Sequence, residues 1–552
     1  MPKVSRKRRS GYHSRQVASC LAAPLPLPLY PSSSMQRYVP DAIACSRRPA
    51  RKLITRLLSA ALLLLPAAPL TLLPHPGVAQ SLPTLGDTER EGLSPLMERR
   101  LGEEIMRDIR SDRDYVDDGP ISEYLNNFGL NLVSIHPEVR GEAGFDFQFF
   151  MVRDPMLNAF ALPGGFIGVN SGLVLAAQSE SELAGVMSHE IGHVAQRHIA
   201  RMLGQQKQNS MIQLAAIVLG ALAGVSKAGG DAAMATMMGG TGLAVQRQLN
   251  FSRDAEREAD RIGLQIMRDG GFDPSGMVTF FGRLQAASRN YSDAVPPYLM
   301  THPLTTERIA DIEARIRDQR YKQRVDNPEF QLVRARTQVL QNDTVQGLRE
   351  NAEKFIAQAR QNTKLQTAAA KYGLAYVYYR QNKFEQAETA LKEAQEAAIP
   401  MKTGIMFGSL DIDIKIARKQ SSQAVQLADA LRKQFPISRT IARQYADALI
   451  AARRTDEAVA YLRDQAQLYR SDAQVQQLLA KAYASQGKQA LQHLALAESY
   501  ALNGSLLAAI DQLGIARRAP DATFYDQSQI DAREREWKER WKDEQKEMKD
   551  RS

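Results

Sequence analysis

The stretch SELAGVMSHEIGHVAQRHIAR, residues 181–201, holds three of the eight histidines of this 552-residue chain. Apolar residues recur three and four positions apart along it, which predicts one long helix. A helix advances 3.6 residues per turn, so His189 and His193 project from one face and can bind one metal ion through their imidazoles. Glu190 follows the first histidine directly, where its carboxylate can take a proton from an attacking water. The stretch therefore has the HExxH pattern that is typical of zinc-dependent hydrolases.

Gly192 stands between the two histidines and costs a helix about 1 kcal/mol relative to alanine. We therefore expect another backbone segment to approach the helix closely at this position. His198 follows His193 by five residues, and we interpret it as a structural residue that faces away from the metal. The competing interpretation of the whole stretch is a surface helix that carries unrelated histidines.

A catalytic zinc ion requires a third protein ligand, and no histidine stands where the longer HExxHxxGxxH motif would place one. The stretch FSRDAEREADRIGLQIM, residues 251–267, predicts a second amphipathic helix with acidic residues on its surface. Glu256 could bind the metal while Asp260, four residues later, supports a ligating histidine. By spacing alone Glu258 is nearly as good a ligand, and solvated helix charge is the alternative for all three.

Four motifs of the chain follow one another in an order that is known from one family of metallopeptidases. They are NAFALPGG (158–165), SHEIGHVAQRH (188–198), SRDAEREADRIG (252–263) and THPLTTER (301–308). Together they resemble the exported bacterial branch of the gluzincin family, which includes the prenyl-protein (CaaX) peptidases. The resemblance implies a mainly α-helical zincin domain with a small β-sheet and one Zn²⁺ per subunit. It also implies that the first glutamate of an ExxxD pattern, here Glu256 before Asp260, is the third ligand.

His302, followed by Pro303, matches the histidine-proline motif of the same family. Proline restricts the preceding residue to an extended backbone and can thereby orient its imidazole. His302 then either stabilises the oxyanion or occupies the fourth zinc position until substrate displaces it, and a structural bond to a carbonyl is the alternative. In the relatives NAFALPGG forms an edge strand beside the zinc cleft, and an edge strand offers unpaired backbone groups to an extended peptide. The implied substrate contacts are Asn158, Ala159, Phe160, Ala161 and Leu162.

From about residue 327 the chain shows continuous helix signals rich in Ala, Gln and Arg. The segment YGLAYVYYRQNKFEQAETALKEAQEAAIP, residues 372–400, has the tetratricopeptide pattern of two helices and a closing proline. The second-helix alanines Ala387, Ala424 and Ala458 lie 37 and 34 residues apart, close to the repeat length of ~34 residues. Such repeats stack into a solenoid whose curved surface binds peptide segments, and a plain spacer is the alternative.

The charge of the chain is concentrated in its leader. Residues 1–79 hold 12 of the 71 Lys and Arg residues but one of the 61 acidic residues, so the rest is close to neutral. This balance argues against a nucleic-acid partner. An apolar core at 57–73, followed by Gly-Val-Ala at 77–79, predicts a signal peptide that is cleaved near Ala79. An uncleaved anchor helix is the alternative, and Met35 could be the true start.

Both cysteines, Cys20 and Cys45, precede the apolar core, so the mature chain would contain none. Disulfides, thiolate chemistry and cysteine metal ligands are therefore excluded. The apolar segment at 211–238 is too short at its core for a bilayer span, which needs ~20 residues. We interpret it as a buried helix, with a mobile flap or a membrane- or client-binding surface as alternatives.

These observations predict four parts: a leader over 1–79, a zinc metallopeptidase domain over 80–326, a tetratricopeptide solenoid over 327–522 and a charged C-terminal helix over 523–552. The resemblance implies a periplasmic zinc endopeptidase in the quality control of outer-membrane β-barrel proteins. Its expected partners are unfolded or stalled β-barrel proteins and the β-barrel assembly machinery, and peripheral contact with a membrane stays open. The competing function is a chaperone or adaptor with suppressed proteolysis. An integral-membrane prenyl-protein peptidase is a third, which the shortage of spanning segments opposes.

Overall fold

The computed structural model describes residues 93–141, 144–204, 253–290, 297–317, 327–361, 363–398 and 404–551. These residues belong to one compact unit, which spans 82–552. The leader at 1–79, with its predicted cleavage site, and the apolar segment at 211–238 lie outside the described residues, so both interpretations stay predictions.

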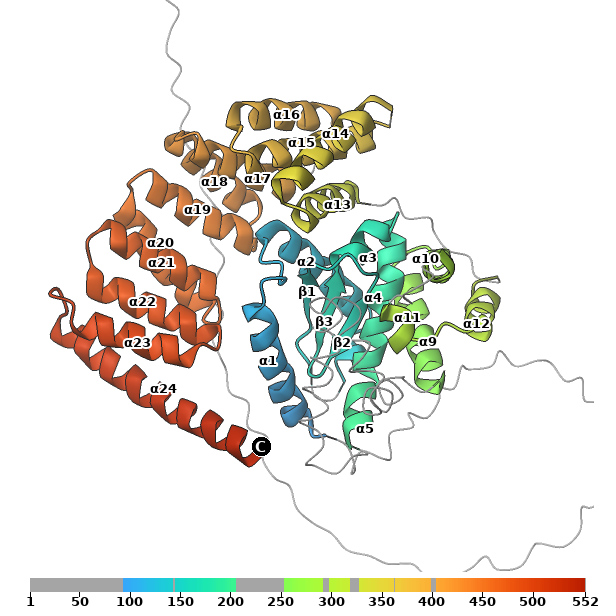
Figure 1. The fold of residues 1–552 in the computed structure, drawn as a ribbon, viewed down its shortest axis with the longest axis horizontal. Helices are drawn as coiled ribbons and strands as arrows, with labels where there is room; N and C mark the ends of the chain where they lie inside the picture. The colour runs from blue at the N-terminus through green and yellow to red at the C-terminus, as the bar shows by residue number, and fades with distance from the viewer. Residues whose placement is uncertain are drawn as a thin grey trace, which may run out of the picture. The chain divides into compact units, whose positions relative to one another are not determined.

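Two helices and a three-stranded sheet begin the described chain (Figure 1). The elements are α1 (Pro95–Ser111), α2 (Gly119–Ile135), the short 3-10 helix η2 (Pro137–Arg140), β1 (Gln148–Val152), β2 (Ala159–Leu162) and β3 (Phe166–Asn170). The strand order is β1-β3-β2, with β3 parallel to β1 and antiparallel to β2. Gly164 and Gly165 form the β2–β3 turn with φ of 77° and 92°, a backbone conformation that side chains other than glycine rarely adopt.

The helices that follow pack against this sheet and against one another (Figure 1). They are α3 (Ser171–Ala176), α4 (Glu180–Ala195), α5 (His198–Gly204), α9 (Arg253–Asp269), α10 (Ser275–Asn290), α11 (Pro297–Thr301) and α12 (Thr306–Arg317). Helix α4 contacts β2 and β3 on one side and α9 and α10 on another. Because it is enclosed, nearly all its residues are buried, including both histidines of the HExxH motif. The mainly helical fold with a small sheet is confirmed.

The prediction of one unbroken helix through residues 181–201 is wrong at its C-terminal end. Helix α4 stops at Ala195, and Arg197 adopts a positive φ of 50° before α5 begins at His198. The side chain of Arg197 bonds to Glu98 of α1 and to the carbonyl oxygen of Leu93, so contacts distant in sequence hold the break. The break changes the direction in which His198 points.

The backbone of a neighbouring helix lies close to Gly192, as the presence of glycine in the middle of a helix predicts. A Cβ at this position would lie 2.9 Å from both the Cα and the carbonyl oxygen of Ala259 in α9. The neighbouring atoms belong to the backbone, so they cannot move aside as a flexible side chain would. Gly192 thus sets the separation of the two helices that carry the candidate ligands.

We expect Gly192→Ala to lower the melting temperature, although alanine is the better helix former. Overpacking a tight contact typically costs 1–3 kcal/mol, whereas the gain in helix propensity is about 1 kcal/mol. Gly282→Ala in α10 is the matched control, because a Cβ there meets nothing within 4 Å and should stabilise the protein. Thermal unfolding of both variants measures the difference, and a Gly192→Ala protein that melts higher than wild type would contradict the close-approach argument.

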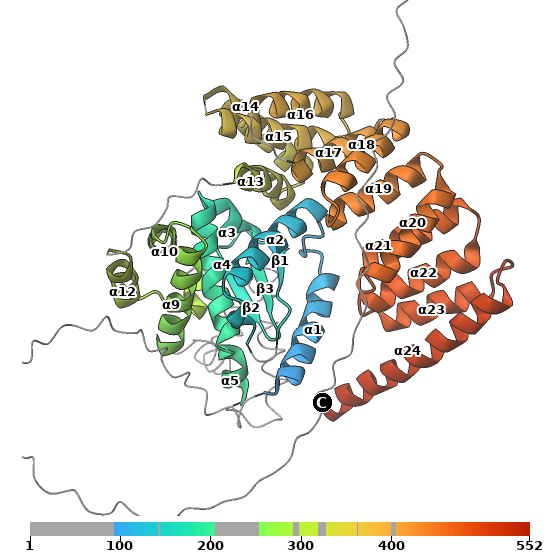
Figure 2. The same ribbon diagram turned by 180° about the vertical axis from the view of Figure 1, so that it is seen from behind.

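A run of paired helices occupies the C-terminal part of the chain (Figures 1 and 2). It comprises α13 (Pro328–Gln341), α14 (Val345–Gln361), α15 (Lys364–Arg380), α16 (Phe384–Ala398), α17 (Gly404–Ala417), α18 (Ser421–Gln434), α19 (Arg439–Ala451), α20 (Thr455–Leu468), α21 (Ala473–Ser485), α22 (Gln489–Leu502) and α23 (Leu506–Arg517). The repeating alanines Ala387, Ala424 and Ala458 lie in α16, α18 and α20, and all three are fully buried. Small side chains at these positions let the paired helices approach closely.

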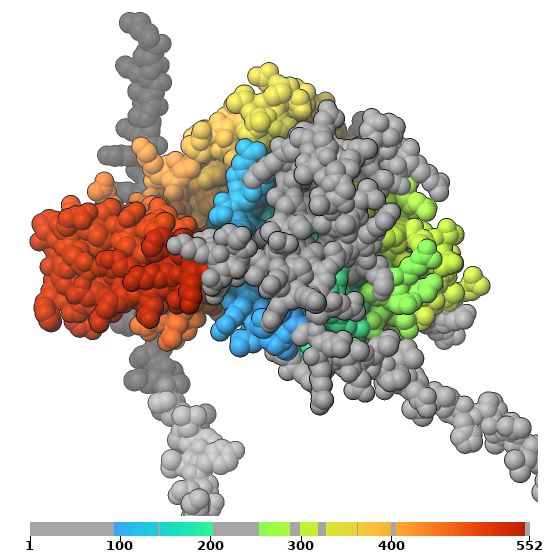
Figure 3. All heavy atoms as spheres, turned by 60° about the horizontal axis from the view of Figure 1, so that its bottom comes forward, coloured from blue at the N-terminus to red at the C-terminus, as the bar shows by residue number. Residues whose placement is uncertain are grey.

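The charged C-terminal segment forms the long helix α24 (Phe524–Arg551), which packs on α22 and α23. Ile530 and Trp537 are buried in this contact, so the apolar residues of an otherwise charged helix cover the end of the run. In Figure 3 the atoms of this C-terminal part, coloured orange and red, lie packed against one another. Among the described residues, no helix combines the length and the apolar character needed to cross a membrane.

Arg336 of α13 joins the run of helices to the N-terminal part. Its guanidinium bonds to both carboxylate oxygens of Asp118 at 2.8–2.9 Å and donates to the Tyr372 hydroxyl at 3.1 Å. It also lies 4.1 Å above the ring of Tyr376. A buried charge is tolerated when a partner of opposite charge and further hydrogen bonds compensate its lost hydration, and Arg336 has both.

Candidate metal centre

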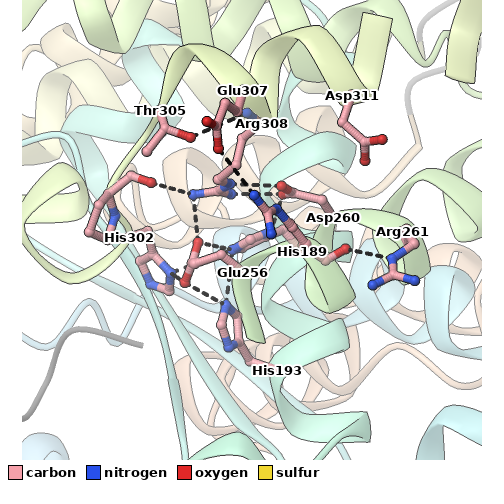
Figure 4. Close-up of polar contacts among 12 residues, drawn as sticks. His189, His193, Glu256, Asp260, Arg261, His302, Thr305, Glu307, Arg308 and Asp311 are labelled. Carbon is pink, nitrogen blue, oxygen red and sulfur yellow. Dashed lines mark hydrogen bonds and ion pairs between the residues drawn. The ribbon is translucent and has the colours of Figure 1, made fainter. Parts of the chain in front are cut away.

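Three elements bring four potential metal ligands together. Helix α4 supplies His189 and His193, α9 supplies Glu256, and His302 follows directly after α11. One donor atom from each lies within 4.8 Å of the others, and all four residues are buried. Figure 4 shows the three imidazoles arranged around the carboxylate of Glu256. Residues separated by more than a hundred positions in sequence therefore converge on one point.

The distances within this cluster match the face predicted for the HExxH helix. The Nε2 atoms of His189 and His193 lie 3.0 Å apart. The Glu256 carboxylate lies 3.5 Å from His189 Nε2 and 3.4 Å from His193 Nε2. Two imidazoles and one carboxylate are a ligand set of catalytic zinc sites. The donors of this chain thus fit zinc by their chemistry.

The electrostatics of the cluster also favour a cation. Burial opposes a charge on His189, but the carboxylates of Asp260 and Glu256 outweigh burial and raise the pKa of His189 to about 9. Both oxygens of Glu190 are buried and accept no hydrogen bond from any residue in the described ranges. A buried carboxylate without a hydrogen bond is costly, and the only ion-pair contact of Glu190 among the described residues is a long one, 3.7 Å from His302 Nε2. A divalent cation held between the potential ligands would supply positive charge beside this carboxylate.

Asp260 and Arg308 contact the potential ligands His189 and Glu256 (Figure 4). Asp260 Oδ1 lies 2.9 Å from His189 Nδ1, the nitrogen that faces away from the cluster. The Arg308 guanidinium donates to both oxygens of Asp260 at 2.8 Å and lies 2.6 Å from Glu256 Oε2. Burial opposes ionisation of Asp260, but its bonds to His189 and Arg308 outweigh burial and lower its pKa. Asp260 therefore lies where it can support His189, and its role behind a metal-bound histidine stays a prediction.

His198 lies against the second ligand and does not face away from the site. Its Nδ1 is 2.9 Å from His193 Nδ1, and its Nε2 is 3.1 Å from Glu258 Oε2. Arg201 donates to the same oxygen at 3.3 Å. Burial lowers the pKa of His198 to about 4, despite the nearby carboxylate of Glu258. Glu258, which spacing alone left open as a ligand, lies outside the cluster and contacts His198 instead.

His302 is buried and contacts the other potential ligands. Its Nδ1 is 2.9 Å from Glu256 Oε1 and 3.4 Å from His189 Nε2, and its Nε2 is 3.7 Å from Glu190 Oε1. This position is that of a fourth donor. Tyr298, one helical turn earlier, stacks on the His302 ring with centroids 4.7 Å apart. Burial and the charge of Glu190 raise the pKa of Tyr298, so its hydroxyl stays protonated.

Comparison with known proteins supports a peptidase. Residues 133–316, which include all four clustered residues, match Peptidase family M48. The chain is 30% identical over 457 residues to the β-barrel assembly-enhancing protease of Escherichia coli strain K12, covering 82% of this chain and 91% of that protein. The chain belongs to peptidase family M48. It is a metallopeptidase with a candidate zinc site.

Two further relatives differ in how much of this M48 peptidase they match. The β-barrel assembly-enhancing protease of Yersinia pestis is 31% identical over 455 residues, which are 82% of this chain and 90% of that protein. The mitochondrial metalloendopeptidase OMA1 of Schizosaccharomyces pombe is 30% identical over 219 residues, which are 39% of this chain and 60% of that protein. The first match thus extends well beyond the peptidase region, and the second covers a shorter part.

Strand β2 (Ala159–Leu162), which Asn158 precedes, lies at one end of the three-stranded sheet that the described residues form in this M48 peptidase. β2 pairs with β3 on one side, and no described strand pairs with its other side. It also packs on α4, the helix that carries the HExxH motif. Asn158 is buried, and its Oδ1 accepts no hydrogen bond from the described residues. Among the described strands β2 thus has one partner, and contact of this segment with substrate stays a prediction.

Proposed function

We propose that this M48 peptidase is a periplasmic zinc endopeptidase that cleaves misfolded or stalled outer-membrane β-barrel proteins and assists the assembly of others. The observation that carries the proposal is the buried convergence of His189, His193 and Glu256, with Glu190 beside them. The similarity across 91% of a protease named for β-barrel assembly supports the substrate class. One zinc ion per chain is the stoichiometry that a single three-ligand cluster supports.

Each residue of the cluster has a different role in the proposed reaction. When bound, zinc polarises the scissile carbonyl and makes water a stronger acid. Glu190, adjacent to His189, takes the proton of the attacking water and passes it to the leaving amine. Asp260 orients His189, and Arg308 holds the carboxylates of Asp260 and Glu256 in place. His302 stabilises the oxyanion once substrate has moved it from its position beside Glu256.

The remaining parts of the chain bring clients to this site. We divide the mature chain into a catalytic domain over 80–326, a tetratricopeptide solenoid over 327–522 and a C-terminal helix over 523–552. We assign to the solenoid the binding of unfolded β-barrel proteins and of the β-barrel assembly machinery, because stacked helix pairs form extended surfaces for peptide segments. The backbone edge of β2, with residues Asn158 to Leu162, receives the segment to be cut. We infer that the leader is removed near Ala79 on export.

The proposed activity is tested with a purified β-barrel protein offered in its unfolded and its folded form. We expect the mature chain to cleave the unfolded form and to spare the folded one. Addition of 1,10-phenanthroline should stop cleavage, and zinc should restore it. Cleavage that continues at the full rate with the chelator would contradict a zinc enzyme. Digestion of casein without digestion of the β-barrel protein would contradict the substrate class.

A chaperone or adaptor with suppressed proteolysis is the second candidate, and the position of His302 favours it. The imidazole lies 2.9 Å from Glu256 and 3.4 Å from His189, among the other potential metal ligands. We infer that His302 in this position would compete with substrate for the candidate metal site. Such a protein would bind clients through its helical repeats and cut only those that displace His302.

A further inference from the structure

The two histidines of the HExxH motif have different partners on their outer nitrogens. His189 Nδ1 faces a carboxylate directly, that of Asp260 at 2.9 Å. His193 Nδ1 faces a second imidazole, that of His198 at 2.9 Å, and the carboxylate of Glu258 follows at 3.1 Å on the far side of that ring. The second histidine is therefore linked to its carboxylate through an intervening imidazole.

The contacts determine where the protons must lie. A metal bound at His193 Nε2 uses the lone pair of that nitrogen, so Nδ1 carries the hydrogen. His198 Nδ1 must then accept this hydrogen, and its own hydrogen lies on Nε2, which donates to Glu258 Oε2. Arg201 donates to the same carboxylate oxygen at 3.3 Å. Every donor in this chain of contacts thus meets an acceptor.

The helix break makes this arrangement possible. In one continuous helix, a residue five positions after His193 would point about 140° away from it. The positive φ of Arg197 turns the chain, so His198 starts α5 with its ring edge-on to His193, with centroids 4.8 Å apart. His198 is 4% exposed, so water cannot readily replace it as the acceptor. The geometry leaves His198 as the partner of His193 Nδ1.

We propose that His198 is a positioning residue of the metal site, which fixes the tautomer and orientation of His193 and is itself oriented by Glu258. The inference rests on the proposed function, because it takes His193 as a zinc ligand. Partners of this kind typically raise the basicity of a ligating imidazole, and their loss costs 10- to 100-fold in metal affinity. The loss of His198 should therefore weaken zinc binding without removing a ligand.

The test measures the zinc dissociation constant of the purified mature chain by competition with a fluorescent chelator. We expect His198→Leu to raise the constant by about 10- to 100-fold. His198→Asn should stay within about threefold of wild type, because its Oδ1 can accept the hydrogen that Nδ1 accepts. Glu258→Ala should weaken binding in the same direction but less. A partly buried histidine of the helical repeats, replaced in His493→Leu, serves as the matched control and should leave the constant unchanged.

The outcomes separate this inference from the proposed function. If His189→Ala binds zinc like wild type, the cluster is not the zinc site and the proposed function fails. If His189→Ala loses zinc while His198→Leu binds it like wild type, the positioning role is overturned and the proposed function stands. If His198→Leu does not fold, as judged by its thermal unfolding, Glu258→Ala decides, and a wild-type constant in that variant overturns the inference. Equal weakening in His198→Leu and His198→Asn also overturns it, because a structural role would not distinguish them.

Discussion

Replacing Glu190 by glutamine should reduce kcat/KM for an unfolded β-barrel substrate by about 10²- to 10⁴-fold, which is the usual contribution of a general base. Glutamine keeps the shape of the side chain but cannot accept a proton from water. The carboxylate it replaces is buried, accepts no hydrogen bond from the described part of the chain and has only a long contact, 3.7 Å, with His302 Nε2, so little structural support is lost. Zinc content and melting temperature should stay at the wild-type level.

Glu307→Gln is the control for the loss of charge near the site. Glu307 is mostly exposed and pairs with Arg257 at 3.1 Å, so its replacement should change kcat/KM less than twofold. A Glu190→Gln enzyme that retains more than a tenth of wild-type activity, with zinc bound, would show that another group takes the proton. His302, whose Nε2 lies 3.7 Å from Glu190, would then be the next candidate.

The same Glu190→Gln protein decides between protease and chaperone in the cell. In a strain that lacks the wild-type copy, the variant should fail to restore β-barrel quality control if cleavage carries the function. Full complementation would show that client binding is sufficient for β-barrel quality control. Proteolysis would then not be the main function of the protein. Because the substitution leaves the helical repeats unchanged, it removes proteolysis and preserves client binding by the repeats.

The sequence predicted the parts of the site that follow from helical periodicity. His189 and His193 share a face because they are four residues apart, and Glu256 and Asp260 share a face of α9 for the same reason. Gly192 indicated a close backbone neighbour, which the structure identifies as Ala259. The choice of Glu256 over Glu258 did not follow from spacing, and required the resemblance to a family.

What the sequence could not predict depends on long-range contacts. The break at Arg197 is held by Glu98 and Leu93, about a hundred residues earlier, so no local pattern indicates it. Without the break, helical periodicity predicts that His198 faces away from the metal site, whereas in the structure it contacts His193. The clamp of Arg308 on Asp260 joins residues 48 positions apart. Periodicity orients a residue on its own helix and does not specify which distant element meets it.

Replacing Glu256 by alanine should raise the zinc dissociation constant by more than about 100-fold, beyond what the loss of an outer partner typically costs. The substitution removes one of three protein ligands, and two histidines alone leave the zinc site incomplete. The protein should still fold, because Arg308 keeps both of its bonds to Asp260 and no buried guanidinium is left unpaired. Metal analysis of the purified variant after dialysis measures the loss.

Asp254→Asn is the matched control for Glu256→Ala, because Asp254 lies on the same helix and its side chain is 92% exposed. We expect it to keep one zinc ion per chain. The decisive contrast is with Glu258→Ala, which removes the carboxylate that spacing alone left as an equal candidate. If Glu258→Ala loses zinc as completely as Glu256→Ala, the assignment of Glu256 as the carboxylate ligand is contradicted. If Glu256→Ala keeps both zinc and proteolysis, the chain hydrolyses peptides by a different arrangement of residues.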